Sequence, residues 1–138
     1  MPERPDAVEQ ALRALRHRDR STAELDARLA KRGVDAEERA QALKTLERVG
    51  YVDDERFART RAEQLAARGS GDALIRHDLE QRGIAAELVD AAVESLEPER
   101  ERARRVVAQR GATLKTARYL ASRGFGEEAL DGIVAHDR

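Results

Sequence analysis

The chain has 138 residues, of which 41% are apolar and only 3% aromatic, so a core must be built from Leu, Ala and Val. Charged residues make up 38%, and 26 Lys and Arg nearly balance 27 Asp and Glu. This balance is typical of helices laced by ion pairs and not of a strongly basic nucleic-acid binder, and the lack of cysteine excludes a disulfide framework and a thiolate metal site.

The N-terminal residues 1–6 hold two prolines and mixed charge, and we expect them to be flexible. They contain no apolar signal region, and no apolar run approaches the length of a transmembrane helix. We therefore expect a cytoplasmic protein that has no membrane contact.

The first part of the chain predicts three helices. Apolar residues recur at three- and four-residue spacing over residues 7–17, which places them on one helix face. Ser21 and Glu24 have the spacing of a capping box, which predicts a second helix that Gly33 ends. A third helix is expected over residues 36–49.

A second set of three helices follows. Helical spacing predicts a helix over residues 53–68 and a turn at residues 69–71. Asp72 is expected to cap the next helix, which Gly83 ends. The last helix of this set is expected over residues 86–96.

The remaining residues predict a third set. Pro98 suits the start of a helix and opens one that reaches about residue 110. Further helices are expected over residues 114–123 and 127–135. Val and Ile stand at helical spacing throughout, and no run alternates with period two, so the expected fold class is all-α.

Three glycine turns share one arrangement. Each glycine follows an arginine, precedes a large apolar residue, and lies four residues after a leucine. In a Schellman cap the leucine and the apolar residue after the glycine touch, so the same type of contact is predicted at all three turns. The three sets are Leu29, Gly33 and Val34; Leu79, Gly83 and Ile84; and Leu120, Gly124 and Phe125.

This register predicts three tandem three-helix repeats, each resembling a helix-turn-helix. After the flexible residues 1–6, the expected repeats cover residues 7–50, 51–97 and 98–138. Stacked repeats contact mainly their neighbours, so we expect an elongated, curved body that suits a partner with an extended groove.

The stretch 49–58 stops one helix and starts the next. Gly50 can adopt the left-handed conformation that ends a helix. We expect Val49 to face inward and Tyr51 to fold back onto Leu46.

The same stretch begins the next helix at Asp53. Its side chain can cap the helix, and Asp54 adds negative charge at the positive end. Val52 and Phe57 stand at the two positions of a hydrophobic staple, so Phe57 is expected in the core.

The sequence contains no convincing catalytic or metal-binding pattern. His17, His77 and His136 lie far apart without a second ligand at metal spacing, and we interpret them as exposed residues at helix ends. The acidic run 53–55 fits a helix start, and Ser21 has no arranged base to activate it. We expect neither enzymatic activity nor a cofactor or metal.

Basic residues gather at both ends, whereas residues 51–97 carry 6 Lys and Arg against 11 Asp and Glu. Such clusters either meet phosphate or an acidic protein face, or form a solvated helix face with partners such as Glu99 and Glu101. The candidates for partner contact are Arg13, Arg16, Arg18, Arg20, Arg102, Arg104, Arg105, Lys115 and Arg118.

The repeats also allow a DNA-binding helix-turn-helix. A DNA reader needs Arg, Asn, Gln or Ser at the start of its recognition helix. The corresponding helices begin near Glu37, Glu87 and Glu127, and acidic starts would face phosphates badly. Specific major-groove reading is therefore disfavoured.

Several motifs together resemble the RecX family of bacterial regulatory proteins. The most specific is Gly-Tyr-Val-Asp-Asp-Glu-Arg-Phe-Ala at residues 50–58, in which Gly50, Tyr51, Asp53, Asp54 and Phe57 are best explained by folding. Residues 21–25, 32–34 and 115–125 carry the rest of the likeness, which runs from about residue 7 to the end.

The resemblance implies a monomeric protein of three helical repeats that binds the RecA–DNA filament and mostly inhibits RecA in recombination and the DNA-damage response. The turn at residues 68–71 has few basic residues where relatives often carry several, so direct DNA contact is expected to be weak or indirect. A DNA-binding regulator and a helical scaffold for another protein remain the alternatives.

Overall fold

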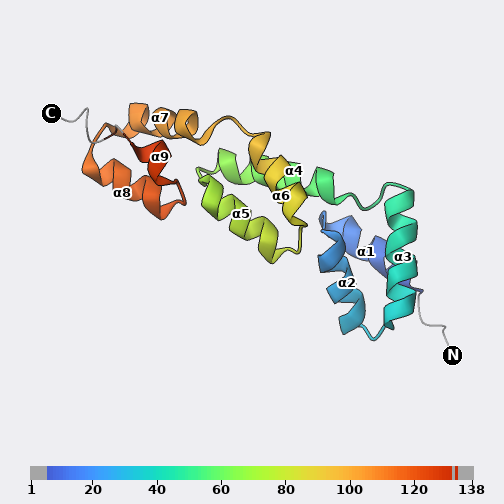
Figure 1. Ribbon diagram of the computed structural model, residues 1–138. Coiled ribbons are helices and arrows are strands. Elements are labelled where there is room, and N and C mark those ends of the chain that lie inside the picture. Colours follow the sequence, from blue (N-terminus) through green and yellow to red (C-terminus); the bar gives the residue numbers. More distant parts are fainter. Residues whose placement is uncertain (1–5, 132, 134–138) are drawn as a thin grey trace. The chain divides into compact units, whose positions relative to one another are not determined.

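The computed structural model describes residues 6–131 and residue 133. Within this part of the chain the fold is all-helical, with nine helices and no strand, as the sequence predicted (Figure 1). None of these helices is long and apolar enough to cross a membrane. The expected flexibility of residues 1–5 and the place of His136 lie outside the described residues. The prediction that the last helix continues from residue 127 to residue 135 is wrong, because it ends at Leu130 and the backbone of Asp131 is not helical.

The chain divides into two compact units. The first unit comprises the residues up to Phe57 together with Arg82–Ile84. The second unit comprises residues 58–81 and the residues from Ala85 onward.

In the first unit, helices α1 (Ala7–His17), α2 (Thr22–Lys31) and α3 (Ala36–Arg48) pack against one another. Burying each large aliphatic side chain contributes about 1.5–3 kcal/mol relative to leaving it in water. The centre of this core is formed by Ala11, Leu25, Leu29, Val34, Leu46 and Val52.

Helix α4 (Asp54–Ala67) starts in the first unit and continues in the second. In the second unit it is joined to α5 (Asp72–Gln81) by Arg61, whose Nε and Nη2 each lie 3.0 Å from an oxygen of Asp78. Helix α6 (Ala86–Glu94) packs against α5.

The last three helices of the second unit also form a packed group. Helices α7 (Glu99–Arg110), α8 (Leu114–Ser122) and α9 (Glu127–Leu130) contact one another around a small core. This core contains Ala103, Leu120, Phe125, Ala129 and Ile133.

Side-chain caps set the starts of five helices among the described residues. The Ser21 and Glu24 pair forms the predicted capping box of α2, with both reciprocal hydrogen bonds present. A cap of this kind contributes about 1 kcal/mol. Equivalent side-chain caps are made by Asp6, Asp35, Asp53 and Thr113, with distances of 2.7–3.2 Å to the backbone nitrogen three residues on.

The expectation that Asp72 caps α5 is wrong. Asp72 is the first helical residue, and the carbonyl of Gly71 accepts the first helical hydrogen bond, from the N–H of Ile75 at 3.1 Å. The Asp72 carboxylate instead accepts a hydrogen bond from Arg102.

Two of the three predicted Schellman turns show their diagnostic hydrogen bond. The N–H of Val34 donates to the carbonyl of Leu29 at 3.1 Å, and the N–H of Phe125 donates to that of Leu120 at the same distance. The glycines of these two turns have φ of 84° and 90°, which favours a residue without Cβ. All six apolar residues of the three turns are buried, Leu79 and Ile84 included.

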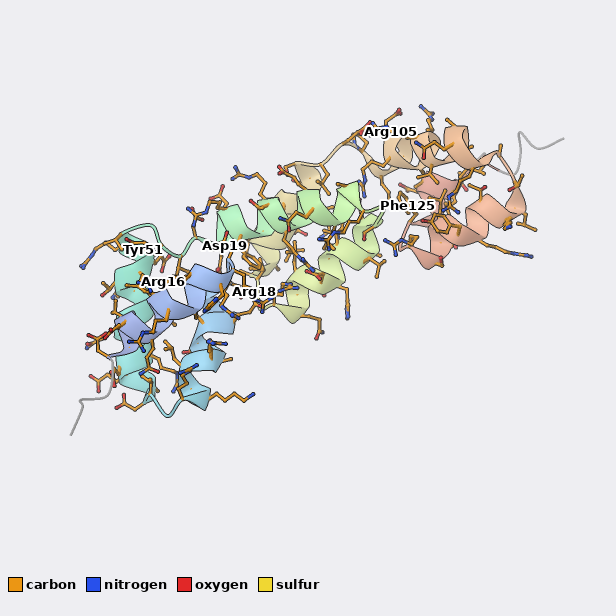
Figure 2. The ribbon with its side chains drawn as sticks, turned by 180° about the vertical axis from the view of Figure 1, so that it is seen from behind. Arg16, Arg18, Asp19, Tyr51, Arg105 and Phe125 are labelled. Atoms are coloured by element: carbon orange, nitrogen blue, oxygen red, sulfur yellow. The ribbon has the colours of Figure 1, made fainter. Side chains whose placement is uncertain are left out.

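The predicted inward positions of Val49 and Tyr51 are wrong. Their exposed fractions are 57% and 58%, although the N–H of Tyr51 donates to the carbonyl of Leu46 at 2.9 Å as a Schellman turn requires. The place in the core belongs to the next residue, Val52, which is 2% exposed. Tyr51 therefore lies on the loop surface between α3 and α4 (Figure 2).

The start of α4 follows the prediction and adds one contact. Asp53 accepts from the N–H of Arg56 at 3.1 Å, and both staple residues, Val52 and Phe57, are buried. The carboxylate of Asp54 accepts from the N–H and the hydroxyl of Thr22 at 2.8 and 3.0 Å. Asp54 thereby ties the start of α4 to the start of α2.

Replacing Phe57 by Ala should lower the free energy of unfolding by about 3–5 kcal/mol, because the ring is buried and leaves a cavity. Tyr51→Ala is the matched control at the neighbouring aromatic residue and should change stability by less than about 0.5 kcal/mol. Urea unfolding followed by circular dichroism measures both. Equal losses in the two variants would contradict the assigned burial.

Candidate partner-binding surface

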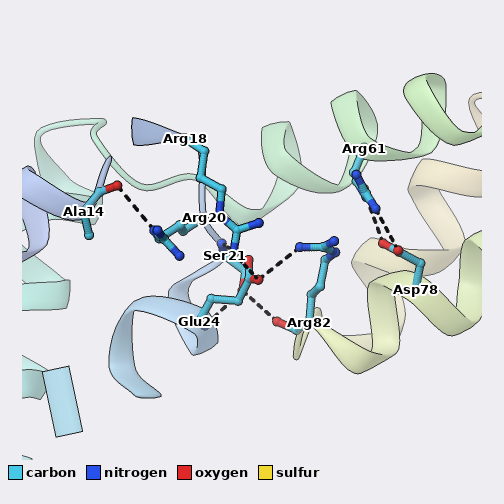
Figure 3. A network of polar contacts seen from close by, with 8 residues as sticks. All are labelled: Ala14, Arg18, Arg20, Ser21, Glu24, Arg61, Asp78 and Arg82. Carbon is cyan, nitrogen blue, oxygen red and sulfur yellow. Dashed lines mark hydrogen bonds and ion pairs between the residues drawn. The ribbon is translucent and has the colours of Figure 1, made fainter. Parts of the chain in front are cut away.

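The arginines at the end of α1 are held in part by local ion pairs. Arg13 lies 3.3 Å from Glu9, and Arg18 lies 3.8 Å from Glu24 (Figure 3). Arg16 is exposed and has no ion pair among the described residues. Exposed pairs of this kind contribute at most about 1 kcal/mol, so they leave the guanidinium groups available to a partner.

Arg20, in the connection between α1 and α2, differs from the other three because its side chain folds back onto α1. Its Nε donates to the carbonyl of Ala14 at 3.3 Å (Figure 3). Burial, followed by the nearby guanidinium groups of Arg18 and Arg28, lowers the pKa of Arg20. Arg20 therefore closes the end of α1 and is a weaker candidate for partner contact than Arg16.

Beside these arginines, a polar network connects the start of α2 with residue 82. The buried hydroxyl of Ser21 donates to the carbonyl of Arg82 at 2.6 Å. The Nη1 of Arg82 donates to Glu24 at 3.0 Å, so Glu24 serves the capping box and this contact together (Figure 3). A Cβ added at Gly83 would lie 2.4 Å from the Cβ of Ala23, so only glycine permits this approach.

The second unit contains an equivalent contact. The N–H of Gly71 donates to the carbonyl of Arg123 at 2.7 Å, and the N–H of Ala73 donates to that of Gly124 at 3.2 Å. A Cβ added at Gly71 would lie 2.4 Å from backbone atoms of Gly124 and Phe125. We call these two arrangements the first and second turn contacts.

The two turn contacts occupy matching positions in the sequence. Ser21 and Gly71 are 50 residues apart, as are the glycines Gly33 and Gly83 that define the predicted register. The two contacts therefore involve equivalent positions of the repeats. The sequence spacing alone does not show that the residues of each contact touch.

The prediction that Arg102 is an exposed partner-facing residue is wrong. Its exposed fraction is 9%, and its Nη2 lies 2.9 Å from the Asp72 carboxylate and 3.2 Å from the carbonyl of Ser70. Its Nη1 donates to the carbonyl of Glu97 at 2.9 Å, and the guanidinium lies 5.7 Å from the ring centre of Phe125. Arg102 therefore stabilises the second turn contact by binding the residues on both sides of Gly71 and by lying against Phe125.

The sequence held a signal for this role. Arg102 lies four residues after Pro98, and the core residue Phe57 lies four residues after Asp53, the cap of the corresponding helix. An arginine at a core position must find hydrogen-bond acceptors, because burying an unpaired charge is costly.

The arginines next to Arg102 on α7 lie on a solvent-exposed helix face and contact nearby residues, which is the alternative that the sequence left open. Arg104 lies 2.7 Å from Glu101, and Arg105 extends outward and pairs with Glu97 (Figure 2). Arg100 donates to the carbonyl of Glu128 at 3.3 Å. Two candidates on α8, Lys115 and Arg118, are exposed and have no ion pair among the described residues.

Glu99 forms a second polar contact at the start of α7. Its Oε1 accepts a hydrogen bond from the N–H of Gly126 at 2.6 Å. Burial raises the pKa of Glu99, the carboxyl of Asp72 raises it further, and the bond from Gly126 and the charge of Arg102 oppose these effects.

The described residues contain no group of three or more His, Asp or Glu side chains that could hold a metal ion. His17 and His77 are exposed, as predicted. His17 is the last residue of α1, but His77 lies in the middle of α5, so its predicted place at a helix end is wrong. The acidic residues Asp53 and Asp54 are engaged at helix starts, as described above.

Comparison with known proteins places the first two sets of three helices in one family. The model of the first three-helix domain of RecX matches residues 7–46, and that of the second three-helix domain matches residues 53–93.

Two relatives carry the name regulatory protein RecX. The protein from Chromohalobacter salexigens is 36% identical over 91% of this chain and 89% of its own length. The protein from Syntrophotalea carbinolica is 42% identical over 72% of this chain, and the match spans 65% of that relative's length. The crystal structure of RecX from Lactobacillus salivarius has a TM-score of 0.80 over 94% of this chain and 93% of its own, at 16% identity, which supports the fold alone.

The tandem three-helix domains define an all-helical protein that acts as a regulator and not as an enzyme. The chain belongs to the RecX family of regulatory proteins.

Replacing Arg102 by Ala should lower the free energy of unfolding by about 3 kcal/mol, because the change leaves Asp72 without its ion-pair partner. The loss lies at the low end for a buried pair, since the Asp72 side chain keeps 29% exposure. Arg104→Ala is the matched control on the same helix and should cost less than about 0.5 kcal/mol. Urea unfolding of both variants tests this, and similar stabilities would refute a structural role for Arg102.

The raised pKa of Glu99 predicts a pH-dependent stability. A carboxyl whose pKa is higher in the folded than in the unfolded chain stabilises the fold at low pH, and this contribution is lost as the pH rises through the folded-state pKa. Glu99→Gln keeps an oxygen for Gly126 but carries no charge, so it should stabilise the protein more at about pH 7 than at about pH 4. Thermal unfolding at both pH values measures the difference, and an equal effect at both would argue against the shift.

Proposed function

We propose that this chain binds the filament that the RecA recombinase forms on DNA and inhibits its activity in recombination and the DNA-damage response. The observation that carries the proposal is membership of the RecX family, with both three-helix domains matched in order along the chain. The protein would act by occupying a surface of the filament.

The proposed binding units are the three helical repeats at residues 7–50, 51–97 and 98–138. Some surface arginines are paired within their own repeat, as Arg13 is with Glu9 and Arg104 is with Glu101. The exposed cations without an ion pair among the described residues, such as Arg16, Lys115 and Arg118, are the first candidates for contact. We propose that the protein acts as a monomer in the cytoplasm.

Direct DNA contact is proposed to be weak or indirect. The helices α3, α6 and α9 all carry Glu in their first turns, where a helix-turn-helix protein would present donors to base edges. The nearly neutral chain also lacks the large excess of positive charge that is typical of a phosphate-binding protein. Neither feature favours a sequence-specific DNA regulator.

The protein should slow DNA-dependent ATP hydrolysis by RecA from the same cell when present at fewer copies than RecA, because a filament modulator acts at growing ends or grooves. The measurement is a steady-state ATPase assay on single-stranded DNA over a titration of the protein. A gel-shift titration with naked duplex DNA provides the control and should show only weak, sequence-independent binding. Unchanged ATPase activity in the presence of folded protein would contradict the proposal. Tight binding to one duplex sequence would favour the alternative of a sequence-specific DNA-binding regulator.

A further inference from the structure

An open pocket of about 510 Å³ lies within the second unit. Its walls come from the end of α4, the segment that joins α6 to α7, helix α7, and residues 119 and 125. None of the sequence motifs predicted this pocket, because its wall residues come from four separate segments.

One part of the wall is apolar. Phe125 is 6% exposed, and Leu96, Val106 and Tyr119 are half-buried. A pocket of this size and character can take a large apolar side chain, and burying one contributes about 1.5–3 kcal/mol.

Two arginines of the pocket stand without an acidic partner among the described residues. The guanidinium of Arg110 lies over the ring of Tyr119, 3.7 Å from its centre, which leaves the N–H groups at its edge free to donate. Arg68 is exposed at the end of α4, and its carbonyl accepts from Arg123 while its side chain carries no ion pair among the described residues.

The other two arginines of the pocket are already paired. Arg102 pairs with Asp72, and Arg105 pairs with Glu97. Arg68 and Arg110 are therefore the two cations that a ligand can neutralise without breaking an existing ion pair.

The chemistry of the wall favours a protein ligand over a nucleic acid. Glu63 and Glu97 also line the pocket, so a ligand with separate carboxylates placed on Arg68 and Arg110 can avoid them, whereas a continuous phosphate backbone cannot. Tyrosine and arginine beside an apolar depression are typical of protein–protein hot spots.

We propose that this pocket docks an acidic segment of a protein partner, with one apolar side chain of the segment in the pocket and its carboxylates on Arg68 and Arg110. The inference rests on the proposed function in one respect: it assigns the segment to RecA. The acidic and apolar character of the segment rests on the pocket itself.

The test uses the full chain with Arg68→Glu and Arg110→Glu combined. The matched control combines Lys44→Glu and Arg48→Glu on α3, which makes the same change in net charge at exposed residues that line no part of the pocket. Circular dichroism and thermal unfolding confirm that both variants are folded. Binding is measured to three probes: the filament that RecA from the same cell forms on single-stranded DNA, a fluorescein-labelled peptide Asp-Glu-Phe-Glu-Asp, and labelled oligothymidylate without RecA.

The pocket variant should bind RecA and the peptide at least about tenfold more weakly than the unaltered chain, and the control should change by less than about twofold. Oligothymidylate binding should respond equally in the two variants. If the unaltered chain binds the peptide through the pocket but does not bind RecA, the proposed function fails and the acidic-segment site stands. Equal binding of RecA and peptide by both variants overturns the inference, as does a selective loss of oligothymidylate binding in the pocket variant.

Discussion

At both turn contacts, the carbonyl that precedes a glycine accepts a hydrogen bond from the start of an earlier helix. Ser21 supplies the donor through its side chain at the first contact, and Gly71 supplies it through its backbone at the second. Both approaches are so close that a Cβ at Gly83 or Gly71 would collide with its neighbour. The donor is a side chain at Ser21 but a backbone N–H at Gly71, because the backbone at Gly71 lies so close to its partner that a serine side chain would not fit there.

Local rules predicted the helix starts and ends well. The capping box at Ser21, the cap at Asp53 and the Schellman turn at Gly33 each depend on residues within one turn of helix, so the sequence contains the whole interaction. The same locality explains why the all-helical fold could be predicted without knowledge of the packing.

Interactions between distant residues could not be predicted in the same way. Tyr51 has the correct local geometry but an exposed side chain, because Val52 fills the core that Tyr51 was expected to reach. Arg102 looked like one more arginine of a solvated helix face, and its acceptors at Ser70 and Asp72 lie about thirty residues earlier. The pocket walls likewise meet only in the folded chain.

The replacement of an apolar core residue by Arg102 has an evolutionary consequence. At the equivalent place in α4, Phe57 can exchange with other apolar residues one at a time, since an apolar side chain leaves no charge to be neutralised. Arg102 and Asp72 form an ion pair, and replacing either residue alone leaves the charge of the other without a partner. These two positions should therefore covary among relatives, with the ion pair kept or replaced by two uncharged residues together, while the position of Phe57 drifts independently among apolar types.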